Sequence, residues 1–119
     1  NASFSSGIIL SKESAELSKT ELLTYALNAI TRIRFCKEDG ELEFKHKFKL
    51  TDAPNGFKAW FMQDNRQTRG LPIIFGHWSS LENIQEKNIY PIDSGCVWGN
   101  ELSAINLENY HISSVKKID

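Results

Sequence analysis

Apolar residues early in the chain recur at intervals of three and four positions. They are Leu22, Leu23, Ala26, Ala29 and Ile30. This spacing places them on one face of an α-helix, which we expect over about residues 20–31, with Thr20 as its N-cap and the apolar stripe in the core.

The pattern then changes from helical spacing to alternation. Apolar residues alternate with polar ones over residues 31–36 and again over 41–48. Asp39-Gly40 lies between the two runs, and this dipeptide favours a tight hairpin turn. The pattern therefore predicts an antiparallel hairpin, with Arg32 and Arg34 together on one face of its first strand.

Shorter apolar runs fill the second half of the chain. Residues 73–75 read as a strand buried on both faces, and 89–93 as a strand in which Pro91 marks an edge or a bulge. Residues 101–107 and 110–115 predict two more strands joined by a turn at Glu108-Asn109. We expect an α+β fold with one main helix and a mostly antiparallel sheet of five to seven strands.

The length and net charge of the chain argue against some classes of function. The chain has 119 residues, enough for one domain with a real core, and a net charge of -1 from 14 basic and 15 acidic side chains. Such a balance argues against nucleic-acid binding, and no apolar run is long enough to span a membrane. Cys36 and Cys96 are isolated thiols, typical of a reduced cytoplasmic protein, so we expect a cytoplasmic location.

Three places in the sequence offer chemistry. His77 follows Gly76 directly after the strand at 73–75, where a histidine either ligates a metal or hydrogen-bonds a loop carbonyl. Arg32 and Arg34 either form a fork for phosphate oxygens or lie on a solvated strand face. Trp98 lies in a glycine-bounded loop, which either places the aromatic ring over a site or simply joins two strands.

Three ordered motifs connect these places to a known family. TRIRFC at 31–36, FGHWSSL at 75–81 and DSGCVWG at 93–99 resemble the C-terminal part of the bacterial symmetrical bis(5'-nucleosyl)-tetraphosphatases. These enzymes are the diadenosine tetraphosphate hydrolases of the calcineurin-like metallophosphoesterase superfamily. The resemblance covers roughly residues 22–112. The superfamily's common GHxH motif here reads Gly76-His77-Trp78-Ser79, without the second histidine.

The resemblance implies a fold and a reaction. Residues 19–119 would form the C-terminal region of a metallophosphoesterase β-sandwich. The intact enzyme would cleave diadenosine tetraphosphate symmetrically into two ADP with two divalent metal ions, manganese or cobalt. By position in the motifs, His77 would be a metal ligand, and Arg32, Arg34 and Trp98 would contact the dinucleoside polyphosphate substrate.

The family's N-terminal signatures, GDxHG, GDxxDRG and GNH[DE], do not occur in these residues. We therefore interpret residues 1–18 as a tag remnant and N-terminal arm, and the chain as an incomplete part of the enzyme. It would hold no catalytic residue and no metal of its own, would be inactive alone, and would self-associate through uncovered strands. Two alternatives remain open: a non-catalytic binding module, or a metallophosphatase of the same superfamily that acts on phosphoproteins.

Overall fold

The computed structural model describes residues 18–47, 49–81 and 84–118. The arm predicted over residues 1–18 lies outside the described residues except for Ser18. The chain divides into two compact units, Asn1–Leu71 and Pro72–Asp119. Among the described residues, no helix is both long enough and apolar enough to cross a membrane.

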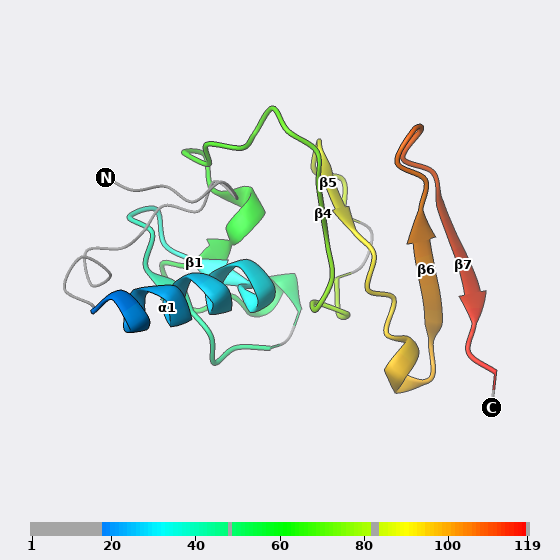
Figure 1. Ribbon diagram of the computed structural model, residues 1–119, viewed down its shortest axis with the longest axis horizontal. Coiled ribbons are helices and arrows are strands. Elements are labelled where there is room, and N and C mark those ends of the chain that lie inside the picture. Colours follow the sequence, from blue (N-terminus) through cyan, green and yellow to red (C-terminus); the bar gives the residue numbers. More distant parts are fainter. Residues whose placement is uncertain (1–17, 48, 82–83, 119) are drawn as a thin grey trace. The chain divides into compact units, whose positions relative to one another are not determined.

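Helix α1, Lys19–Arg32, opens the described part of the first unit (Figure 1). Its N-cap is Ser18, whose hydroxyl accepts a hydrogen bond from the Glu21 N–H at 3.3 Å, while the Glu21 carboxylate accepts from the Ser18 N–H at 2.9 Å. This reciprocal capping box satisfies two backbone donors at once. The prediction of Thr20 as the cap is therefore wrong by two positions, although the helix itself is confirmed.

The apolar stripe of α1 is less buried than its spacing suggests. Ala29 is fully buried, but Leu23 and Ile30 are 63% and 55% exposed. The stripe therefore forms the core only in part. The other buried apolar residues of this unit come from the chain after the helix: Ile33, Phe35, Cys36, Ala59 and Phe61.

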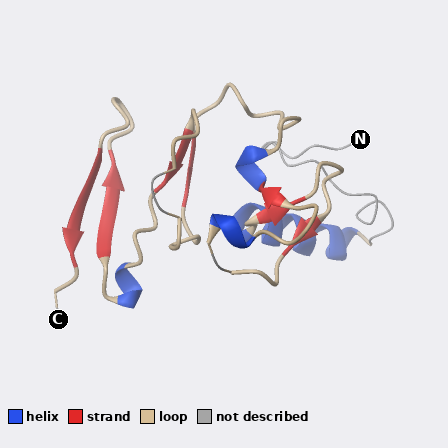
Figure 2. Cartoon of the chain, turned by 180° about the vertical axis from the view of Figure 1, so that it is seen from behind, coloured by secondary structure: helices blue, strands red, loops and turns tan. Residues whose placement is uncertain are grey.

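Three two-residue strands form an antiparallel sheet in the first unit, in the order β2-β1-β3. They are β1, Phe35–Cys36; β2, Leu42–Glu43; and β3, Lys58–Ala59. The Lys37 N–H donates to the Glu41 carbonyl at 2.9 Å, and Gly40 adopts a left-handed φ of 93°, so the predicted hairpin is confirmed. Its strands are shorter than predicted, because α1 continues to Arg32 and β1 begins only at Phe35. Two 3-10 turns, η2 (Leu50–Asp52) and η3 (Trp60–Met62), complete the unit (Figure 2).

The second unit contains a parallel pair and an antiparallel hairpin. Strands β4 (Ile73–Phe75) and β5 (Ile89–Pro91) pair in parallel, with Ile73 opposite Ile89. Strands β6 (Glu101–Ile105) and β7 (Ile112–Lys116) pair antiparallel, with Leu102 opposite Val115. A 3-10 turn, η4 (Cys96–Trp98), lies between β5 and β6.

The α+β class and a strand number within the predicted five to seven are confirmed in the described residues, but the prediction that the strands form one sheet is wrong. Seven short strands form three separate sheets of three, two and two strands in the described residues. Strand β4 is half-buried rather than buried on both faces, since β5 is its only strand neighbour in the described chain. Among the described residues of this unit, the buried apolar ones are Trp78 and Ile89.

Candidate functional site

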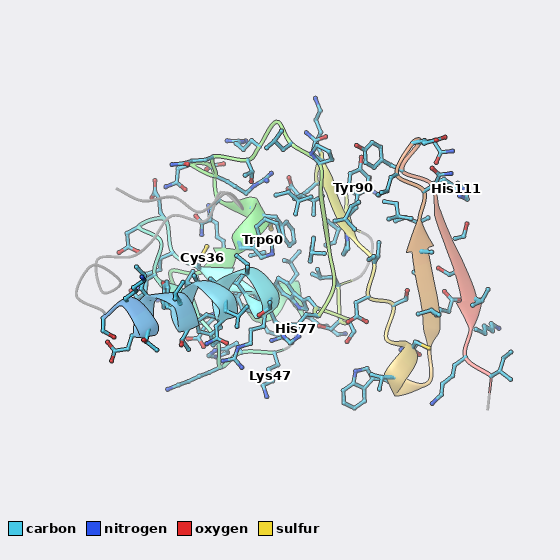
Figure 3. All side chains as sticks on the ribbon, viewed as in Figure 1. Cys36, Lys47, Trp60, His77, Tyr90 and His111 are labelled. Atoms are coloured by element: carbon cyan, nitrogen blue, oxygen red, sulfur yellow. The ribbon has the colours of Figure 1, made fainter. Side chains whose placement is uncertain are left out.

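His77 has an uncommon backbone conformation. It is exposed and adopts a left-handed φ of 73°, immediately beyond β4 (labelled in Figure 3). A residue other than glycine in this region is uncommon and costs about 1–3 kcal/mol when it is strained. Two neighbours fix the turn: Phe75 accepts a hydrogen bond from the Ile92 N–H at 2.9 Å, and Trp78 is only 1% exposed. The backbone at His77 is therefore held between a paired strand and a buried indole.

An open cleft of about 410 Å³ lies where the carboxyl ends of β4 and β5 meet. Its lining includes Gly76, Asp93, Ser94, Glu101 and Ser103. A Cβ atom on Gly76 would lie 3.9 Å from the Asp93 Cβ, so the strand ends approach each other closely here. Carboxyl ends of neighbouring parallel strands are a common place for ligands in α/β proteins.

Sequence reasoning did not select Asp93 or Glu101 as site residues. Asp93 is the first residue of the DSGCVWG motif and lies at the end of a predicted strand. That position could have indicated a site residue. For Glu101 the sequence carried no comparable signal, because its place in the cleft depends on how β6 follows η4.

The loop that carries Trp98 is closely hydrogen-bonded. Gly95 and Gly99 flank η4 with left-handed φ angles of 74° and 94°. The Asp93 carboxylate accepts from the Gly95 N–H at 3.0 Å, and the Gly95 carbonyl accepts from the N–H groups of Trp98 at 2.9 Å and Asn100 at 3.2 Å. Trp98 is nevertheless 77% exposed, so a fixed backbone holds a solvent-exposed indole.

The two arginines of the TRIRFC motif do not share a strand face, which corrects the sequence prediction. Arg32 is the last residue of α1, and its guanidinium lies 5.3 Å from the centre of the Phe44 ring. Arg34 follows in the extended segment before β1 and is half-buried. Burial, followed by the positive charge of Arg32, lowers the pKa of Arg34 from its usual range. That second effect indicates that the two guanidinium groups are close enough to interact.

The predicted site residues fall in both units: Arg32 and Arg34 in the first, His77 and Trp98 in the second. In the part of the chain that the structure describes, no three His, Cys, Asp or Glu side chains come close enough to hold a metal ion. The donors present therefore do not fit a metal centre by themselves. His77 as a metal ligand stays a prediction.

Comparison with known proteins relates most of the chain to curated proteins that share one name. No protein-family model matches the chain. Curated proteins named "Bis(5'-nucleosyl)-tetraphosphatase, symmetrical" do match it. The one from Glaesserella parasuis is 46% identical over 106 residues, which cover 88% of this chain and 39% of the relative.

Two further relatives carry the same name. The Pseudomonas fluorescens protein is 44% identical over 99 residues, 82% of this chain and 34% of the relative. The Burkholderia thailandensis protein is 44% identical over 94 residues, 79% of this chain and 33% of the relative. The chain thus spans between a third and two fifths of the length of these relatives. The resemblance indicated by the three motifs is confirmed: most of this chain is related to a part of the symmetrical bis(5'-nucleosyl)-tetraphosphatases.

Proposed function

We propose that the chain works as part of a hydrolase that cleaves diadenosine tetraphosphate symmetrically into two ADP. The observation that carries the proposal is 44–46% identity, over most of the chain, to proteins named for this activity. Because the chain spans 33–39% of their length, the activity is proposed for a polypeptide that includes the rest of that length.

In that polypeptide, His77 contributes one ligand to a divalent metal ion, manganese or cobalt. Support comes from its exposure directly beyond β4, at the carboxyl end of a strand, since an imidazole nitrogen is a common metal ligand. A metal pair would supply charge neutralisation at the phosphates and an activated water. The described residues do not form such a centre alone, so the remaining ligands belong to other parts of the polypeptide.

Arg32 and Arg34 bind substrate phosphate in this proposal. A guanidinium presents a planar set of donors that matches two phosphate oxygens, and positive charge stabilises a phosphoryl group in transfer. Support comes from the influence of the Arg32 charge on the pKa of Arg34, which indicates two cations within interaction range. Stacking of Arg32 on Phe44 also restrains its side chain.

The test uses the polypeptide at the relatives' full length. His77→Ala should lose bound manganese and reduce diadenosine tetraphosphate turnover at least about 10-fold, because loss of even an outer-shell partner of a metal ligand costs about 10–100-fold. His111→Ala is the matched control, because His111 is also exposed in the second unit but lies beside the hairpin β6–β7. Metal content is measured by elemental analysis and products by chromatography. Full metal content in His77→Ala, or no ADP from the unaltered enzyme, would overturn the proposal.

The arginines are tested in the same assay. Arg32→Lys and Arg34→Lys keep the charge but lose the planar fork, and at least one should lower kcat/KM about 10-fold or more. Arg69→Lys, in the same unit and exposed, serves as the control. A phosphorylated peptide assayed in parallel separates the dinucleotide substrate from a phosphoprotein. Unchanged kinetics in both variants would contradict a contact between either arginine and the phosphates, and would leave both arginines with a structural role alone.

A further inference from the structure

We propose that Trp98 and the cleft at the ends of β4 and β5 form a nucleoside subsite, in which the indole stacks on the base and carboxylates bind the ribose. The inference rests on the proposed function for the source of the nucleoside, one end of a dinucleoside polyphosphate. It adds that the second unit binds a nucleoside end of that substrate rather than its phosphates, and which residues bind it.

The first step is the exposure of Trp98. The chain has three tryptophans; Trp78 is 1% exposed, Trp60 is half-buried and Trp98 is 77% exposed. Loops with solvent-exposed aromatic rings are usually free to move, but η4 is bounded by two left-handed glycines and held by the backbone bonds to Gly95. A base that stacks on an indole carried by such a fixed backbone requires little ordering of the loop.

The second step is the position of this turn beside the cleft. Cys96, the first residue of η4, lines the cleft together with Gly76 and Asp93. Trp98 lies two residues further along the same turn. His77 directly follows Gly76, so the cleft adjoins the residue that we propose to act at the phosphates. A volume of about 410 Å³ is within the range of about 300–1,000 Å³ found for small-molecule sites.

The third step is the chemistry of the lining. Two carboxylates, Asp93 and Glu101, contribute to it, and no lysine or arginine does among the described residues. Such a lining repels phosphate but accepts hydrogen bonds from ribose hydroxyls, as acidic side chains do in dinucleotide-binding folds. One Asp93 oxygen already accepts from the Gly95 N–H, so in this proposal Asp93 supports the turn and Glu101 accepts from the ribose hydroxyls.

Two serine hydroxyls complete the polar part of the cleft. Ser94 and Ser103 both line it and hydrogen-bond each other, and Ser103 also pairs with Ser114 at 2.6 Å. This chain of hydroxyls fixes the wall formed by β6 relative to the end of β5. The cleft therefore combines apolar lining residues with fixed polar groups, and the turn that carries Trp98 begins at its edge with Cys96, which is the composition of a small-molecule site.

The binding test uses adenosine, which has a base and a ribose but no phosphate. Adenosine is titrated into the isotopically labelled 119-residue chain while the three indole N–H signals are followed by NMR, with Trp98→Phe assigning one of them. We expect a saturable shift of the Trp98 signal and a weaker response of 2',3'-dideoxyadenosine. Glu101→Gln should remove the difference between the two ligands, and Val97→Ala, an 80% exposed neighbour on the same turn, should leave binding within about twofold.

A Trp98 signal that does not respond to adenosine, or that responds equally to both ligands before Glu101 is changed, would overturn the subsite. A second readout uses the polypeptide at the relatives' full length. Trp98→Ala should raise KM for diadenosine tetraphosphate at least about 5-fold, as loss of base stacking does, while hydrolysis of inorganic tetraphosphate stays unchanged.

The two proposals can fail separately. Adenosine binding at Trp98 without any turnover of diadenosine tetraphosphate would refute the proposed function and keep the subsite. Turnover with the same KM in Trp98→Ala would refute the subsite and keep the proposed function.

Discussion

Cys36 has a strongly shifted pKa. Its side chain is 8% exposed, and burial, followed in the same direction by the charge of Asp39, raises the pKa of the thiol from its usual value of 9.0 to about 11. Its carbonyl accepts a hydrogen bond from the Gln63 side chain at 2.6 Å, which holds β1 against the segment after η3. Cys36 is therefore a structural thiol rather than a reactive one.

This shift predicts a stability that depends on pH. Below pH 9.0 the thiol is protonated in both the folded and the unfolded chain, so its full contribution to stability is present. Above pH 9.0 the thiol of the unfolded chain loses its proton, while that of the folded chain keeps its proton up to about pH 11. The free energy of unfolding should therefore fall by about 3 kcal/mol over that range, since each pKa unit corresponds to about 1.4 kcal/mol.

Denaturant unfolding at several pH values measures this loss. Other groups titrate in the same range, so the informative quantity is the difference between the unaltered chain and Cys36→Ala. That difference should shrink as pH rises. A constant difference across the range would show that the thiol titrates alike in both states.

At the scale of elements, the η4 turn depends on its two glycines in different ways. Gly95 has a left-handed φ of 74°, and a Cβ there would lie 2.9 Å from the Asn100 Nδ2 atom. Gly99 has a φ of 94° but no atom within 4 Å of its Cβ position. Gly70 also has open space and no left-handed φ, so it tests the effect of an added methyl group alone.

The three alanine variants should form a graded series. Gly70→Ala should change stability by less than about 0.5 kcal/mol. Gly99→Ala should cost about 1–2 kcal/mol for the left-handed backbone, and Gly95→Ala should cost more, because Asn100 must also shift. Urea midpoints at a constant m value give the comparison. Equal midpoints for all three variants would mean that the turn is not held as described.

At the scale of the whole molecule, the hairpin β6–β7 exposes apolar side chains. Leu102 and Val115 are cross-strand partners on one face of the hairpin and are 61% and 64% exposed. Within the described residues, β7 has β6 as its only strand neighbour, so its outer edge presents backbone groups that another strand can pair with.

We therefore expect the 119-residue chain to self-associate through this hairpin. Val115→Lys should lower the weight-average mass measured by sedimentation, because it places a charge in the apolar face. Leu23→Lys makes the same change at a residue that is 63% exposed on α1 and should leave the mass unchanged. A monomer before any substitution would contradict the expectation, and an equal effect of both variants would assign association to general surface hydrophobicity.

The sequence by itself determined the local elements of this protein. Helical spacing predicted α1 to within one residue at each end, Asp39-Gly40 predicted the hairpin, and the apolar run at 73–75 predicted β4 with its observed bounds. These features depend on neighbours a few positions apart, which periodicity and turn residues record directly. The motifs also predicted the relationship to the tetraphosphatases that the comparisons confirmed.

Only the tertiary structure decided which strands pair and what their ends bring together. The parallel pairing of Ile73 with Ile89, the left-handed φ of His77 and the cleft that joins Gly76 to Glu101 all depend on contacts between residues distant in the sequence. Alternation fixes which side chains share a face of a strand but not which strand lies beside it, since every strand offers the same backbone donors and acceptors to any neighbour. Burial also depends on the tertiary structure. Leu23 and Ala29 belong to the same apolar stripe of α1, yet Leu23 is exposed and Ala29 is buried.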